Sequence, residues 1–188
     1  MRKFFFLILF FVFGYAWAGV EFPAKPVPPR LVNDFTNTLA PDDIQAVCRA
    51  IAGRPGVIVC GELPEDVDFP QAICSLAAQL DCPILAEPLS NLRFGQHDLS
   101  HVAVRYNAWL NDSGSHARVR PEWVLRFGAF PVTRNLQNYT ASASVQIVVQ
   151  PWPRWSDPAQ RITHMLRADP TAFCTALVAA LPSVPTAT

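Results

Sequence analysis

Lysine is nearly absent from this chain, and there is no excess of charge of either sign. Only Lys3 and Lys25 are lysines; the remainder of the fifteen basic residues are arginines, and fifteen acidic residues balance them. A chain without net charge has no electrostatic reason to bind nucleic acid or an anionic membrane surface. We therefore expect no nucleic-acid partner.

Sequence motifs for cofactor binding and nucleophilic catalysis are also missing. Gly61 and Gly128 each follow an apolar run, but neither begins a G-x-G-x-x-G or a Walker-type sequence. No G-x-S-x-G nucleophile elbow occurs either. These absences disfavour a flavin- or nicotinamide-binding protein and a serine hydrolase. They predict no catalytic residue and no cofactor-binding residue in this chain.

Cysteines are few and odd in number. The chain has five and no C-x-x-C pair, which leaves zinc and thioredoxin-like chemistry without support. Cys48, Cys74 and Cys174 fall on apolar helical stripes, and Cys60 ends an apolar run. Buried free thiols of this kind suit a reducing compartment such as the cytoplasm.

The amino terminus indicates the opposite compartment. Arg2 and Lys3 precede an apolar run over residues 4–13, and Ala16-Trp-Ala18 has the small-x-small pattern of a cleavage site. Residues 1–18 therefore read as a secretory signal peptide, with an uncleaved membrane anchor as the alternative. Because the cysteines favour the cytoplasm, the localisation stays open at this point.

Apolar runs alternate with helical patterns along the rest of the chain. A proline-rich connector at 19–40 precedes a domain at 41–182, and a short tail follows at 183–188. Short apolar strands between amphipathic helices predict a Rossmann-like, doubly wound α/β domain with a mainly parallel sheet of five or six strands. We expect strands near 57–60, 83–86, 123–127, 145–149 and 161–166, and helices near 41–51, 69–80, 99–110, 132–139 and 170–181.

One histidine pair has the spacing of a metal site. His97 and His101 lie four residues apart, so on a helix the two imidazoles could share a metal. Asp98 reads better as the cap of that helix, and no third ligand is evident. The pattern predicts a solvated helix start and no metal site.

Arg134 is the strongest candidate for ligand binding. It follows the strand expected at 123–127 and opens the next helical pattern. The carboxyl end of a parallel strand and a helix N-terminus both favour anions, and a guanidinium can pair with a carboxylate there. The alternative is a surface arginine on a solvated helix start.

A set of segments between residues 41 and 181 carries a family likeness through its order and spacing. The segments are Arg54-Pro-Gly-Val-Ile-Val with Gly61, Cys82-Pro-Ile-Leu-Ala-Glu-Pro-Leu-Ser90, Arg126-Phe-Gly-Ala-Phe-Pro-Val-Thr-Arg134, Asp157-Pro with Arg161, and Arg167-Ala-Asp-Pro170. Together they resemble the central domain of 2-succinyl-5-enolpyruvyl-6-hydroxy-3-cyclohexene-1-carboxylate synthase, a thiamine diphosphate enzyme family of menaquinone biosynthesis.

The resemblance implies a transferase of three domains, in which a dimer completes each site. Outer domains hold thiamine diphosphate and Mg²⁺, and the enzyme decarboxylates 2-oxoglutarate and adds the product to isochorismate. Arg134 matches a basic residue near these anionic substrates; some members carry a basic pair there, whereas this chain has Asn135 at the second position. The Gly-Asp-Gly diphosphate motif, its paired asparagines and the domain with the activating glutamate are missing. The chain alone is therefore expected to bind no cofactor and to be inactive.

Two hypotheses follow. The chain is a central-domain fragment whose partners are cofactor-binding domains on other chains, or it is a non-catalytic, exported or membrane-tethered α/β binding or scaffold module. A homo-oligomer is compatible with both hypotheses.

Overall fold

A seven-stranded parallel sheet forms the centre of the protein in a computed structural model that describes residues 31–32, 39–112, 119–152 and 156–182. Every strand pair is parallel, and the strand order is β1-β7-β6-β5-β2-β3-β4. The strands are β1 (Leu31–Val32), β2 (Gly56–Cys60), β3 (Ile84–Ala86), β4 (Val102–Ala103), β5 (Trp123–Phe127), β6 (Val145–Gln150) and β7 (His164–Arg167).

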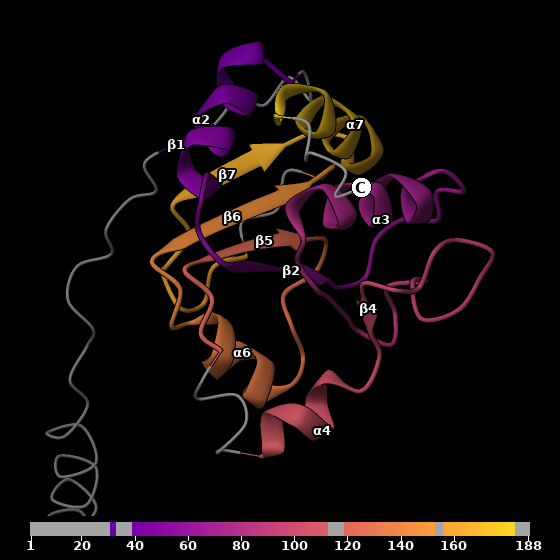
Figure 1. Ribbon diagram of the computed structural model, residues 1–188. Coiled ribbons are helices and arrows are strands. Elements are labelled where there is room, and N and C mark those ends of the chain that lie inside the picture. Colours follow the sequence, from indigo (N-terminus) through magenta and orange to yellow (C-terminus); the bar gives the residue numbers. More distant parts are fainter. Residues whose placement is uncertain (1–30, 33–38, 113–118, 153–155, 183–188) are drawn as a thin grey trace, which may run out of the picture.

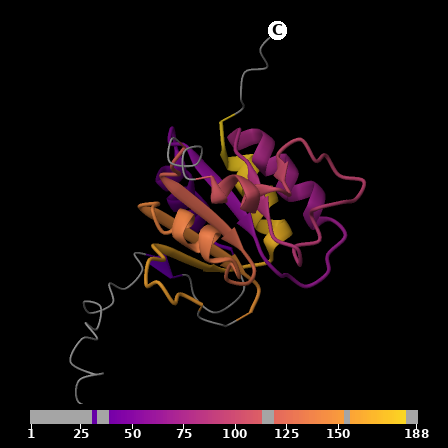
Figure 2. The ribbon, with the colours of Figure 1, turned by 90° about the horizontal axis from the view of Figure 1, so that it is seen from below.

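Helices cover both faces of this sheet (Figure 1). One layer contains α2 (Pro41–Ile51), α3 (Phe69–Leu80) and α7 (Pro170–Ala180), and the other contains α4 (Tyr106–Asn111) and α6 (Arg134–Thr140). Figure 2, which looks from below, shows α4 and α6 in front of the strands. The predicted doubly wound α/β class is therefore confirmed.

Local sequence explains where two helices begin. Pro41 is the first residue of α2, and Asp42 and Asp43 lie in its first turn, where they favour the positive end of the helix dipole. The carboxylate of Asp169 accepts a hydrogen bond of 2.7 Å from the backbone N–H of Ala172 and so caps α7.

Alternating residues of the central strands form two large apolar cores, and Val148, Ile162 and Met165 form a third, smaller cluster. In β2, Ile58 and Cys60 join the core under α2, α3 and α7, whereas Val57 and Val59 join the core under α4 and α6. The first core contains Phe127 in edge-on contact with Phe173, with ring centroids 5.8 Å apart. Burial on both faces is why these strands read as continuous apolar runs.

The predicted helix at 99–110 is only partly correct. Val102 and Ala103 form β4 and pair with Ile84 and Leu85 of β3, and a helix begins only at Tyr106. The apolar spacing of this segment fits a helix, but the free edge of β3 offers backbone hydrogen bonds that only the folded chain provides. The last predicted strand also shifts, from 161–166 to His164–Arg167.

The sheet extends beyond the predicted domain boundary. β1 comes from the proline-rich connector and pairs with His164 and Met165 of β7, although the sequence shows no strand pattern there. Residues 1–18, where a signal peptide or anchor is predicted, and the tail at 183–188 lie outside the described residues. Within the described ranges, no helix is long and apolar enough to cross a membrane.

Candidate functional site

The chain crosses over in opposite directions from β2 and β5, the two neighbouring strands at the centre of the sheet. β2 leads outward to β3, and β5 leads to β6 on the other side. Sheets of this kind place ligands outside the carboxyl ends of the strands at such a switch point. The loops after β2, β3 and β5 are therefore the candidate site, and Figure 1 shows these loops at one edge of the sheet.

Two glycines bring the loops after β2 and β5 into backbone contact. The N–H of Gly61 donates to the carbonyl of Phe127, and the N–H of Ala129 donates to the carbonyl of Glu62, both at 3.0 Å. A Cβ at Gly61 would lie 2.5 Å from the Ala129 oxygen, and one at Gly128 would lie 2.2 Å from the Glu62 oxygen. These glycines thus serve close packing of two loops, and the packed backbone fills the space between them.

Glu87 anchors the loop that follows β5. It comes directly after β3, is only 4% exposed, and accepts a hydrogen bond of 3.0 Å from the backbone N–H of Val132 through Oε1. Burial raises the pKa of Glu87, and hydrogen bonds from the backbone of Val132 and Thr133 together with the charge of Arg126 oppose this rise.

Arg126 lies within β5 and is 6% exposed. Its Nη2 donates to the carbonyl of Ser156 at 2.8 Å, and its guanidinium lies 5.1 Å from the ring centroid of Phe130. Burial lowers the pKa of Arg126 to about 10, against the opposing charges of Asp157 and Glu87. Arg126 therefore connects the loop after β5 with the loop after β6.

Arg134 lies where the sequence places it, at the first residue of α6 beyond β5, and its side chain is exposed. The neighbouring Asn135 donates from Nδ2 to Oδ1 of Asn111 in α4, so this side chain turns towards the adjacent helix. Val132 falls within the predicted helix at 132–139, but it precedes α6 and is 80% exposed. Its backbone, rather than its side chain, is held in place.

The sequence analysis did not identify Glu87 and Arg126 as residues that hold the loops at the carboxyl ends of the strands. Both residues stand in the segments that carry the family resemblance, yet nothing in the local pattern marks Glu87 as buried or pairs it with a loop 45 residues away. An acidic residue directly after a buried strand was the available signal, since it places a carboxylate at the ligand-binding edge.

The histidine pair is not on a helix, which corrects the prediction of a helix start at this position. Nε2 of His97 lies 3.0 Å from the carbonyl of Leu92, and Asp98 accepts hydrogen bonds from the backbone and hydroxyl of Ser100 in a turn. In the described parts of the chain, no group of three His, Cys, Asp or Glu residues could hold a metal ion.

Known proteins match most of this chain but only a part of their own length. A 2-succinyl-5-enolpyruvyl-6-hydroxy-3-cyclohexene-1-carboxylate synthase from Dechloromonas aromatica is 48% identical over 163 residues, which are 83% of this chain and 30% of that enzyme. Synthases of the same name from Oceanobacillus iheyensis and Geobacillus thermodenitrificans are 33% and 38% identical over 77% and 75% of this chain. These matches cover 25% and 24% of the two enzymes. No protein-family model matches the chain.

Proposed function

The chain belongs, as a partial member, to the family of 2-succinyl-5-enolpyruvyl-6-hydroxy-3-cyclohexene-1-carboxylate synthases, and we propose that it acts as the central domain of such an enzyme. A match that spans 24–30% of the relatives fits one domain of a larger protein. The single α/β unit, with its loops anchored at the carboxyl edge, supports this role.

The central domain supplies a binding group rather than the chemistry. In the proposed complete enzyme, 2-oxoglutarate is decarboxylated and joined to isochorismate, and both substrates carry carboxylates. The observation that carries the proposal is the fixed loop after β5, which presents the exposed Arg134 at the ligand-binding edge. A guanidinium forms charge-assisted hydrogen bonds with a carboxylate in this setting.

The described residues do not fit thiamine diphosphate or Mg²⁺. The space between Gly61 and Gly128 is filled by packed backbone, and no cluster of metal ligands occurs among the described residues. We therefore assign both groups to the remaining domains, on other chains or in a longer protein. In this proposal a dimer of the assembled enzyme completes each site, and the chain alone gives no turnover.

A chimera tests the role of Arg134. Residues 41–182 of this chain replace the matching segment of the Dechloromonas aromatica synthase, to which it is 48% identical. We expect an active chimera in which Arg134→Ala lowers kcat/KM by about tenfold or more, because a hydrogen bond to a charged group contributes about 1.5–3 kcal/mol. Arg134→Lys should retain part of the activity, since the charge remains.

Arg49→Ala is the matched control, because Arg49 is exposed on α2 in the opposite helix layer. It should leave kcat/KM unchanged. If Arg134→Ala leaves kcat/KM of an active chimera unchanged, Arg134 has no role in substrate binding. Turnover by this chain alone with both substrates, thiamine diphosphate and Mg²⁺ would refute the assignment of the chemistry to other domains.

A further inference from the structure

The position of the exposed Arg134 depends on the loop that leaves the sheet after β5. Backbone contacts hold the first part of this loop, where the N–H of Ala129 donates to the carbonyl of Glu62 at 3.0 Å. The last part of the loop leads into α6, and the side chain of Val132 there is 80% exposed. Apolar burial therefore does not hold the residues directly before Arg134.

The start of α6 has no side-chain cap. Thr133 occupies the position before the helix, but its side chain makes no capping hydrogen bond. Nε2 of Gln137 donates to the carbonyl of Pro131 at 2.7 Å, but Gln137 belongs to α6 and so connects the loop only to the helix that the loop enters. By contrast, the hydrogen bond of 3.0 Å from Val132 to Glu87 connects this part of the loop to the end of β3.

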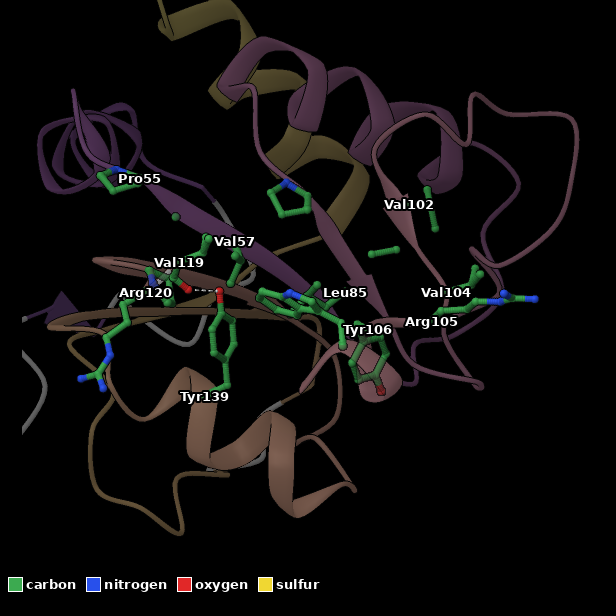
Figure 3. Close-up of a pocket in the computed structure, with 15 residues that line it drawn as sticks. Pro55, Val57, Leu85, Val102, Val104, Arg105, Tyr106, Val119, Arg120 and Tyr139 are labelled. Atoms are coloured by element: carbon green, nitrogen blue, oxygen red, sulfur yellow. Dashed lines mark hydrogen bonds between the residues drawn. The ribbon is translucent and has the colours of Figure 1, made fainter. Parts of the chain in front are cut away.

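Glu87 lies among three other elements, β2, α4 and β5, each of which places a titratable side chain near it. Burial raises the pKa of Cys60 in β2 and of Tyr106 in α4, and the charge of Glu87 adds to both rises. Arg126 in β5 carries the opposite charge and favours the ionised carboxylate. Tyr106 begins α4 and lines the pocket drawn in Figure 3. A carboxylate enclosed in this way has little freedom to move, so it is a rigid anchor for the loop.

We infer that Glu87 is a positioning residue for Arg134. Its carboxylate is buried and holds the backbone of Val132, and this backbone sets where the guanidinium of Arg134 meets a substrate carboxylate. Small displacements of the loop matter, because a hydrogen bond weakens steeply when donor and acceptor are misaligned. The inference rests on the proposed function, since it requires that Arg134 binds substrate.

Hydrogen exchange in the full chain tests the anchor itself. In Glu87→Ala the amide of Val132 loses its acceptor. We expect its exchange rate, relative to that of the Gly61 amide, to rise about tenfold or more, as the loss of a hydrogen bond to a charged group predicts. The Gly61 amide bonds to the carbonyl of Phe127 and reports any general loosening of this edge of the sheet. NMR measures both amides in the same sample.

Glu122→Ala is the matched control, because Glu122 is exposed and precedes β5 at its opposite end. It should leave the ratio of the two exchange rates unchanged. Thermal unfolding checks that Glu87→Ala is folded. If it is not, Glu87→Met replaces it, since methionine fills the space but offers no oxygen acceptor. A ratio that stays at the wild-type value without the Glu87 carboxylate overturns the inference.

A double-mutant cycle in the chimera with the Dechloromonas aromatica synthase tests the link to function. Glu87→Ala should lower kcat/KM about fivefold through a higher KM, and Glu87→Gln, which keeps an oxygen acceptor, should lower it less. If Glu87 acts through Arg134, Glu87→Ala should change kcat/KM by less than about twofold once Arg134→Ala is present. A residue that only stabilises the fold would lower kcat/KM by the same factor in both backgrounds.

The results separate this inference from the proposed function. If Arg134→Ala leaves kcat/KM unchanged, the proposed function fails and the inference fails with it. If Arg134→Ala lowers kcat/KM, but Glu87→Ala has no effect or the same effect in both backgrounds, only the inference is overturned. A smaller effect of Glu87→Ala in the Arg134→Ala background, together with faster exchange at Val132, supports both.

Discussion

The Oε1 atom of Glu87 lies 3.0 Å from the backbone nitrogen of Val132 and accepts its hydrogen bond. This contact joins the loop after β3 to the loop after β5, only two residues before Arg134. A buried carboxylate therefore fixes the backbone that presents an exposed cation. The geometry of the candidate site depends on a residue that does not itself reach the surface.

Replacing Glu87 should separate hydrogen bonding from charge. Glu87→Ala leaves the Val132 N–H without its acceptor, and we expect the free energy of unfolding to fall by about 1–3 kcal/mol. Glu87→Gln keeps an oxygen acceptor at the same distance from the backbone, so its free energy of unfolding should fall much less. Urea unfolding measures both, and equal losses in the two variants would show that the hydrogen bond is not what matters.

Stability should also depend on pH through Glu87. Burial raises its pKa, so the folded protein binds more protons at this site than the unfolded protein does. The free energy of unfolding therefore falls as pH rises from the ordinary glutamate value, about 4.3, through the raised value. Glu87→Gln lacks this component, so the stability of the variant relative to the wild type should increase as pH rises from the ordinary glutamate value through the raised value. Urea unfolding across that range checks the slope, and a constant difference would contradict it.

Arg126→Ala should be strongly destabilising. Its guanidinium is buried, bonds to the carbonyl of Ser156 and lies against Phe130, so truncation leaves an unpaired acceptor and an empty space. We expect a loss of about 2–3 kcal/mol in the free energy of unfolding. Arg161→Ala, at an exposed position, should change stability by less than about 0.5 kcal/mol. A loss at Arg126 as small as that at Arg161 would contradict the buried packing of Arg126 against Phe130.

Two glycines with positive φ offer a matched comparison. Gly53 has φ +66°, and a Cβ added there would meet nothing within 4 Å, whereas Gly128 has φ +74° and a Cβ added there would meet the carbonyl of Glu62. Gly53→Ala should lower the free energy of unfolding by about 1–2 kcal/mol, because alanine is strained in a left-handed conformation. Gly128→Ala should cost clearly more, because the new Cβ also forces the loops apart. Thermal and urea unfolding measure the stability of both variants. Equal losses would mean that the contact between the two loops adjusts to the new Cβ without a loss of stability.

The thiols should differ in reactivity. Burial raises the pKa of Cys74 to about 11 and that of Cys82 to about 12, and it raises the pKa of Cys60 and Cys174 as well. Because the thiolate is the reactive form, these four should resist iodoacetamide in the folded protein. Cys48 is only half-buried and should react first. Intact mass should show one label under native conditions and five after unfolding; several native labels would contradict the described burial.

Local sequence was sufficient where an element depends on its own residues. The run Trp123–Phe127 is a strand with the predicted bounds, and the helices α2 and α3 follow their apolar spacing. The helix α7 begins at Pro170, as the predicted helix at 170–181 does. The position of Arg134 followed as well, since the end of a strand and the start of a helix are both local events.

The sequence by itself determined that this protein is a doubly wound α/β domain and that Arg134 stands at the carboxyl edge of its sheet. Apolar periodicity and the residues that begin and end helices are local features, so each segment of the sequence carries them by itself. Only the tertiary structure decided that two residues of the connector and two of the segment after the histidines join the sheet, and that Glu87 and Arg126 hold its loops. Strand pairing and buried polar contacts depend on partners far away in the chain, and no local pattern carries that information.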